Sequence, residues 1–172
     1  MRGDRRGATL SPTLFVTTPE EGSQMGEVLD LLREGLALND ANDLDGFVAL
    51  MGADVEWLTP DGPLHGPDAV REYVGRFRGA FPDGKHTIDR AVESGNAVAV
   101  EGRCEGTHTG ALAAPQGDVP PTGRTVSMTF ALFVAGDLDT GECRRCAIYM
   151  DQMAMAAQLG LIPEPQATGA VS

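Results

Sequence analysis

The sequence predicts an α+β fold, because helical patterns fill its first part and strand patterns fill its second. Apolar residues recur at helical spacing from Met25 to Leu36. After Pro82–Gly84 the pattern changes to strand-like segments that are separated by turn residues. Helices that precede a run of strands, rather than alternating with them, are typical of α+β proteins with an antiparallel sheet.

The first part of the chain predicts three helices and one strand. The helix that begins at about Ser23 is separated by Asn39–Asp43 from a second helix over Leu44–Met51. The alternating segment Asp54–Leu58 predicts a strand. A third helix opens at Gly66–Asp68. Its apolar face comprises Val70, Tyr73, Val74, Phe77 and Phe81.

The second part predicts four strands and a final helix. The strands lie at about 85–93, 96–108, 124–135 and 141–149. A tight turn joins the first two strands, and a Pro/Gly-rich loop follows the second. A short helix rich in Met and Ala then ends at Gln158–Gly160. We expect the four strands to form an antiparallel meander.

The length of 172 residues suits one domain with a sizeable core. We expect a flexible leader over residues 1–22, a single domain over 23–162 and a flexible tail over 163–172, with Met25 as an alternative start. No apolar run is long enough to span a membrane, and the apolar patch of the leader is too short for a signal-peptide core. The sequence therefore predicts a cytoplasmic protein.

The net charge of −12 argues against nucleic acid or an anionic membrane as a partner, since both bind basic patches. The three cysteines, Cys104, Cys143 and Cys146, form no disulfide framework. Residues three apart on a strand face opposite sides, so Cys143 and Cys146 are not expected to share a metal. We interpret all three as packing residues.

Four groups of segments occur in an order typical of one family. They are Asn42–Phe47 followed by Asp54–Trp57, His65–Arg71, Gly106–Gly110 followed by Pro121–Arg124, and Asp151 with Gln158–Gly160. In these segments the chain resembles the SnoaL-like polyketide cyclase family of the NTF2-like superfamily. The resemblance spans roughly residues 25–162.

The resemblance implies an NTF2-like cone, in which a curved antiparallel sheet wraps around three N-terminal helices and is followed by a short C-terminal helix. It implies a deep apolar pocket, a polyketide-like substrate and no cofactor or metal. Asp151 fills the position of an acid–base residue that closes a ring by intramolecular aldol reaction. A homodimer formed through the open sheet face is also implied.

The chain departs from the family pattern just before Asp151. Many relatives carry a Glu-His-Trp-like run where this sequence has Arg145–Ala147, and Met150 replaces a frequent aromatic residue. The missing His removes one proton partner for Asp151. The family also contains hydroxylase-like and epoxide-opening members, so the fold alone does not choose an activity.

Two residues are candidates for catalysis. Asp151 follows a strand in an apolar segment, where poor solvation raises the pKa of a carboxyl group. The alternative for Asp151 is that it caps the next helix. His108 ends a strand on whose face Gly102 and Gly106 leave space for a ligand. A strand-end histidine bonded to a loop backbone is the alternative for His108.

Six residues are candidates for substrate binding: Trp57, Tyr73, Phe77, Met128, Phe130 and Tyr149. The first five are interpreted as pocket lining or as plain core, whereas Tyr149 pairs with Asp151, stacks on a ligand or faces outward. His86 begins a strand and is expected to be exposed. The cluster Asp40, Asp43 and Asp45 is explained by helix capping, or by the paired acids of an epoxide-opening enzyme.

The sequence thus favours a cofactor-independent, polyketide-cyclase-like enzyme. A non-catalytic small-molecule-binding protein is the first alternative. An isomerase or epoxide hydrolase is the second, and it requires a second acidic group at the same cavity.

Overall fold

The computed structural model describes residues 26–114 and 117–163. The predicted leader and all of the predicted tail except Pro163 lie outside the described residues. Within the described ranges, no helix combines the length and the apolar character needed to cross a membrane.

Four helices and six strands make up the described part of the chain. The helices are α1 Glu27–Asp40, α2 Leu44–Ala49, α3 Pro67–Ala80 and α4 Gln152–Gln158. The strands are β1 Met51–Thr59, β2 Gly62–His65, β3 Lys85–Ser94, β4 Ala97–Thr107, β5 Thr125–Asp137 and β6 Glu142–Met150. The predicted α+β class is confirmed. The short strand β2 was not predicted, because Pro63 reads as part of a turn.

One curved, six-stranded sheet has the strand order β2-β1-β6-β5-β4-β3. The predicted antiparallel meander runs from β3 to β6. The sheet is nevertheless mixed, because β1 pairs in parallel with β6. The two strands begin at the same end of the sheet, where the Leu50 carbonyl accepts the Cys143 N–H at 2.8 Å.

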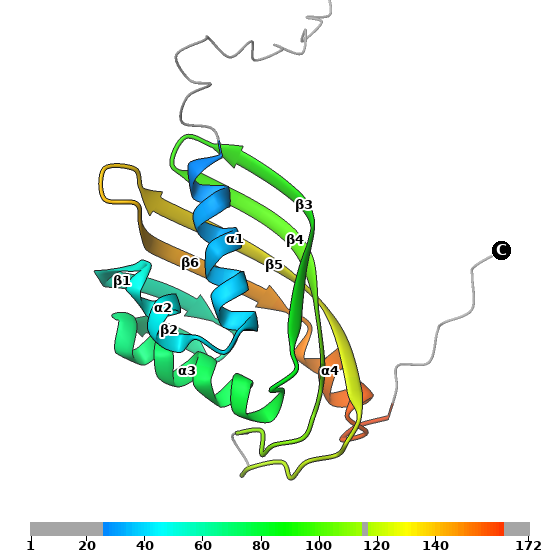
Figure 1. Cartoon of the computed structure of the whole chain (residues 1–172). Helices are drawn as coiled ribbons and strands as arrows, with labels where there is room; N and C mark the ends of the chain where they lie inside the picture. The colour runs from blue at the N-terminus through cyan, green and yellow to red at the C-terminus, as the bar shows by residue number, and fades with distance from the viewer. Residues whose placement is uncertain (1–25, 115–116, 164–172) are drawn as a thin grey trace, which may run out of the picture.

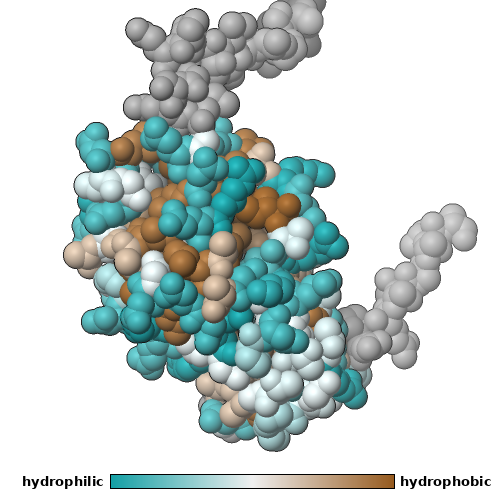
Figure 2. Space-filling model, in the orientation of Figure 1, coloured by the Kyte–Doolittle hydropathy of each residue, from teal (hydrophilic) through white to brown (hydrophobic). Residues whose placement is uncertain are grey.

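Helices α1, α2 and α3 lie on one face of the curved sheet (Figure 1). Helix α4 packs beside the N-terminal end of β5, where the Gln158 side chain accepts the Ser127 N–H. Figure 2 shows this side of the molecule, where apolar side chains gather beside α1 and hydrophilic ones surround them. Beneath α1 and α3, alternate residues of β4 and β5 are buried. The larger core cluster therefore lies between these helices and the concave face of the sheet.

A bulge in β6 changes which side chains face the interior. The register between β5 and β6 shifts between Ala135 and Gly136, and Arg144 is the extra residue. Cys143 and Cys146 are consequently both buried. The expectation that they face opposite sides is wrong, because the bulge breaks the strand's alternation between them.

Candidate functional site

A cavity of about 150 Å³ lies between the helices and the concave face of the sheet. Its lining is mostly aliphatic and aromatic, and side chains of α1, α2, α3 and all strands except β2 contribute to it. The residues there that can hydrogen-bond or titrate include Asn39, Trp57, Tyr73, Arg78, His86, Cys104, Cys143 and Cys146. Among the described residues, no Asp or Glu lines this cavity.

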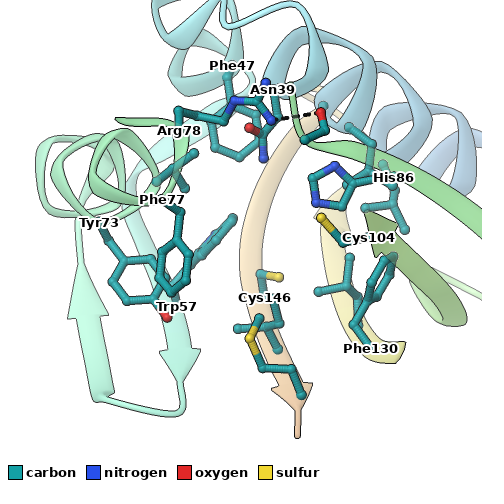
Figure 3. A pocket seen from close by; sticks show the side chains of 18 of the residues that line it. Asn39, Phe47, Trp57, Tyr73, Phe77, Arg78, His86, Cys104, Phe130 and Cys146 are labelled. Carbon is teal, nitrogen blue, oxygen red and sulfur yellow. Dashed lines mark hydrogen bonds between the residues drawn. The ribbon is translucent and has the colours of Figure 1, made fainter. Parts of the chain in front are cut away.

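Five of the six predicted substrate-binding residues lie in the cavity wall: Trp57, Tyr73, Phe77, Met128 and Phe130. Figure 3 shows Trp57, Tyr73 and Phe77 on one side and His86, Cys104 and Phe130 on the other. Most of these residues also pack with the core, so lining and core are the same residues here.

The polar centre of the cavity wall is a pair formed by His86 and Asp40. The His86 Nδ1 lies 2.6 Å from Asp40 Oδ1, and the His86 backbone N–H donates to Asp40 Oδ2 at 3.0 Å. Each side chain is only 17% exposed. The His86 ring also packs against the Phe130 ring in a T-shaped arrangement, with 5.7 Å between ring centroids. The expectation that His86 is exposed is therefore wrong.

The Asp40 carboxylate decides which His86 nitrogen can act as a base. An ionised carboxylate only accepts hydrogen bonds, so the proton of a neutral His86 ring resides on Nδ1. The Nε2 lone pair is then free, and no described residue donates a hydrogen bond to it. This arrangement provides a proton acceptor at the cavity wall, held in one tautomer and orientation by Asp40.

Contacts at both ends of α1 hold this pair in place. At the first turn, the Glu93 carboxylate of β3 accepts the backbone N–H groups of Gly26, Val28 and Leu29 at 2.9–3.3 Å. At the last turn, the Lys85 Nζ donates to the Asp40 carbonyl at 2.8 Å. Helix α1 is thus attached to β3 at two points, and Asp40 lies beside His86 for this reason.

The three acidic residues that the sequence groups together have different roles. Asp43 caps α2 by accepting the Gly46 N–H at 2.8 Å, and Asp45 pairs with Arg71 at the surface. Only Asp40 turns toward the sheet. A carboxylate in the last turn of a helix is disfavoured by the helix dipole, and this was the one signal in the sequence that could have marked Asp40.

Several buried polar atoms near the cavity lack partners. Within residues 26–114 and 117–163, Asn39 Oδ1, Trp57 Nε1 and Tyr73 Oη make no hydrogen bond that meets normal geometry. Thr59 lies near the Tyr73 hydroxyl, but its own hydroxyl already donates to the Gly62 carbonyl. Burial, and then the charge of Asp61, raise the pKa of Tyr73 to about 12, so Tyr73 stays neutral.

The cysteines around the cavity are thiols rather than thiolates at neutral pH. Burial raises the pKa of both Cys104 and Cys143 to about 11, and it also raises the pKa of Cys146. Over the described part of the chain, no three His, Cys, Asp or Glu side chains gather as a metal site would require.

His108 lies outside the cavity lining, although the sequence places it on the cavity-facing side of its strand. It is completely buried, and its Nδ1 accepts the Thr122 backbone N–H at 3.2 Å. Its ring packs against Phe81, with centroids 5.2 Å apart. The alternative of a strand-end histidine bonded to a loop backbone is thus the observed one. The space at Gly102 is taken by the Phe130 ring, which lies 2.5 Å from where a Cβ would stand.

Asp151 and Tyr149 lie away from the cavity. Asp151 is exposed and caps α4 by accepting the Ala154 N–H at 2.9 Å, which confirms the capping alternative. The expected poor solvation of its carboxylate is wrong, because Asp151 is exposed where β6 ends and α4 begins. Tyr149 is 53% exposed on the convex face, where its ring contacts Phe133 edge to face.

The fold agrees with comparisons to known proteins. A model of the SnoaL-like domain matches residues 32–136, which is more than half of the chain. The chain belongs to the SnoaL-like domain family. A comparison with curated proteins finds no significant match.

Solved structures of other SnoaL-like and related proteins share the architecture. AclR from Streptomyces galilaeus, provisionally named a hydroxylase, is 22% identical with a TM-score of 0.71, covering 83% of this chain and 87% of AclR. A provisionally named SnoaL-like polyketide cyclase from Jannaschia sp. CCS1 is 18% identical, with a TM-score of 0.69 and coverage of 86% and 99%. IdmH from Streptomyces antibioticus, provisionally named a polyketide cyclase, is 22% identical, with a TM-score of 0.64 and coverage of 77% and 98%. At these identities the likeness shows the fold alone.

Proposed function

We propose that this SnoaL-like protein is a cofactor-independent acid–base enzyme that closes a ring in a small carbonyl compound, as a polyketide cyclase does. The His86–Asp40 pair at the cavity wall is the observation that carries the proposal. The names of the structural neighbours support the reaction class, and the mostly apolar lining supports a small substrate with a largely apolar body.

The proposed reaction is an intramolecular aldol closure. His86 Nε2 takes a proton from the carbon beside a carbonyl group, and Asp40 stabilises the imidazolium that forms. The enolate carbon attacks a second carbonyl of the same molecule, forming one C–C bond. The resulting alkoxide takes the proton back from His86. Every step is a proton transfer or bond formation within the substrate, so the proposed chemistry calls for no cofactor.

The enolate oxygen needs a donor that is already in position. Trp57 Nε1–H and the Tyr73 hydroxyl lie across the cavity from His86 in Figure 3. Neither makes a hydrogen bond of normal geometry within the described residues, although the Cys143 thiol lies near the Trp57 N–H and Thr59 lies near the Tyr73 hydroxyl. A substrate carbonyl between these two groups and His86 would receive a hydrogen bond that the free protein lacks.

Asp151 remains the competing candidate, since the family resemblance assigns the acid–base role to its position. Its exposure and its capping bond weigh against that role, because a well-solvated, hydrogen-bonded carboxylate is a weak base. His108 is the second competing candidate. Its Nδ1 is already an acceptor, so a neutral ring carries its proton on Nε2 and offers no free lone pair there.

Proton abstraction can be tested before the substrate is known. We expect the protein to speed the exchange of the α-protons of phenylacetone for deuterium in D₂O, measured by NMR. His86→Gln should lower the exchange rate about 10²- to 10⁴-fold, the usual contribution of a positioned base. Asp151→Asn, which preserves the cap, is the matched control and should retain the wild-type rate.

If Asp151→Asn loses the exchange activity and His86→Gln keeps it, the base is Asp151 and the assignment to His86 is wrong. Binding of phenylacetone without exchange by the wild-type protein would favour the non-catalytic binding protein. The isomerase or epoxide hydrolase alternative requires a second acidic group within hydrogen-bonding reach of the cavity. The described lining contains no Asp or Glu, and Asp40 reaches the cavity only through His86.

We also propose that two copies associate through the convex face of the sheet. Register partners form an apolar row across five strands, comprising Val92, Ala99, Phe133, Ala147 and Leu58. Phe133 is 54% exposed at the centre of this row. Such a patch favours an isologous contact with the same patch of a second copy.

The expected assembly is a dimer at micromolar concentration in sedimentation velocity. Phe133→Glu should convert it to a monomer, because charges at the centre of the patch would face each other. Thr129→Glu, on the same strand and face but outside the row, should leave the dimer intact. A monomeric wild-type protein would contradict the proposal.

A further inference from the structure

Arg78 places a positive charge inside an otherwise apolar site. It lies in the last turn of α3, is only 6% exposed and lines the cavity described above. Arginine is seldom this deeply buried unless it is paired with an acid.

The observed partners of Arg78 are backbone carbonyls. Nη1 donates to the Gly84 carbonyl and Nη2 to the Pro82 carbonyl, each at 2.9 Å. These bonds use two of the five guanidinium N–H donors, and the buried Nε has no partner. Gly84 makes this packing possible, since a Cβ at that position would lie 2.9 Å from Nη1.

No carboxylate neutralises this charge within the described part of the chain. Arg78 takes part in none of the ion pairs there. Asp40 is engaged by His86, and Asp83, the acid whose pKa Arg78 helps to lower, is exposed and accepts the Thr107 N–H at 2.7 Å.

Carbonyl bonds and the C-terminal dipole of α3 compensate only part of the cost of burial. A helix C-terminus favours a cation, but burying an ion without a counter-ion costs several times what a dipole returns. A fork of N–H donors at a cavity wall matches a carboxylate, which accepts two parallel hydrogen bonds. An anionic ligand would supply the missing counter-ion.

We propose that the cavity binds a small organic anion of about one ring in size, whose carboxylate is held by Arg78. This inference rests on the proposed function only in placing the substrate in the same cavity. Figure 3 shows Arg78 and Asn39 at one end of the cavity and His86 along the wall. A carboxylate held at that end directs the rest of the molecule toward His86.

The size follows from the volume of the cavity. It encloses about 150 Å³, and an engineered apolar cavity of about 150 Å³ in another protein binds benzene. A single ring with a short acidic side chain is therefore the fitting class.

Two probes of the same shape and different charge test this inference. We expect phenylacetate to bind about tenfold or more tightly than the neutral phenylacetamide, measured by titration calorimetry with the wild-type protein. Equal binding of the two, tighter binding of the amide, or no phenylacetate binding at millimolar concentration would overturn the proposal. None of these outcomes depends on catalysis, so each is distinct from a failure of proton exchange.

Two substitutions assign the preference to Arg78. Arg78→Met should remove it while leaving phenylacetamide binding within about twofold. Asn39→Asp, a change of nearly equal volume, should also remove it, because the new carboxylate at the same end of the cavity would serve as an internal counter-ion. If Arg78→Met does not fold, Asn39→Asp decides the matter. Retention of the charge preference in a folded variant of either kind would show that the anion binds elsewhere.

Discussion

His86 and His108 are both strand-end histidines of one sheet, yet their hydrogen bonds suit them to opposite roles. The Nδ1 of His86 donates to a carboxylate, so its free Nε2 lone pair can accept a proton at the cavity. The Nδ1 of His108 accepts a backbone N–H, and the whole ring is buried against Phe81. The partner of Nδ1, more than the position on the strand, decides whether a histidine can act as a base.

The largest expected effect tests the partner of His86. Asp40→Asn should lower the rate of phenylacetone proton exchange about 10²- to 10⁴-fold, because an amide can donate to Nδ1 and stabilise the wrong tautomer. Asp43→Asn is the matched control, since Asn also caps helices well. An Asp40→Asn protein with the wild-type rate would show that the carboxylate does not orient the base.

The next effect concerns the stability that His108 provides. His108→Gln should lower the free energy of unfolding by about 2 kcal/mol near neutral pH, because the Thr122 N–H and the ring packing lose their partner. Proton exchange should remain at the wild-type rate. Loss of exchange activity in a stably folded His108→Gln protein would place His108 in the site and remove the contrast with His86.

The pH dependence of stability provides a further test of the buried state of His108. Burial lowers the pKa of His108 below its ordinary value of 6.5. The unfolded chain then binds more protons than the folded one as the pH falls below that value, so the free energy of unfolding decreases with acidity. Denaturant unfolding between about pH 7 and about pH 5 should show a shallower decrease for His108→Gln than for the wild type. Equal slopes would contradict a buried, neutral His108.

The smallest effect concerns Asp151. Asp151→Ala should cost about 1 kcal/mol of stability through loss of the α4 cap, and Asp151→Ser should restore most of it. Thermal unfolding measures both, and both proteins should retain proton exchange. A loss of exchange that Ser does not restore would return Asp151 to the catalytic site.

Most of the fold was predictable because the helical and strand patterns are local. The bounds of the four meander strands agree with the sequence to within two residues. The parallel pairing of β1 with β6 and the bulge at Arg144 depend on contacts between distant segments, which no local pattern reveals.

The candidate site was predictable only in its apolar part. Trp57, Tyr73 and Phe77 were identifiable because large aromatic residues on the core-facing sides of helices and strands commonly line an internal cavity. His86 was missed, although the alternation of His86 with Ile88 on one face of β3 was visible in the sequence. Its pairing with Asp40, 46 positions away, depends on how α1 is attached to β3.

The parallel pairing of β1 and β6 has a consequence for the order of folding. Asp54 and Arg144 form an ion pair although they are 90 positions apart, and Trp57 pairs with Cys146 across the same strands. Contacts between such distant segments form slowly, because a long loop must close first. We expect the β3–β5 meander to gain hydrogen-exchange protection early and Trp57, the only tryptophan, to reach its native fluorescence late. If the exchange protection of the meander and the native Trp57 fluorescence developed at the same rate, this order would be contradicted. In the expected order, the cavity between the helices and the sheet is the last part of the molecule to form.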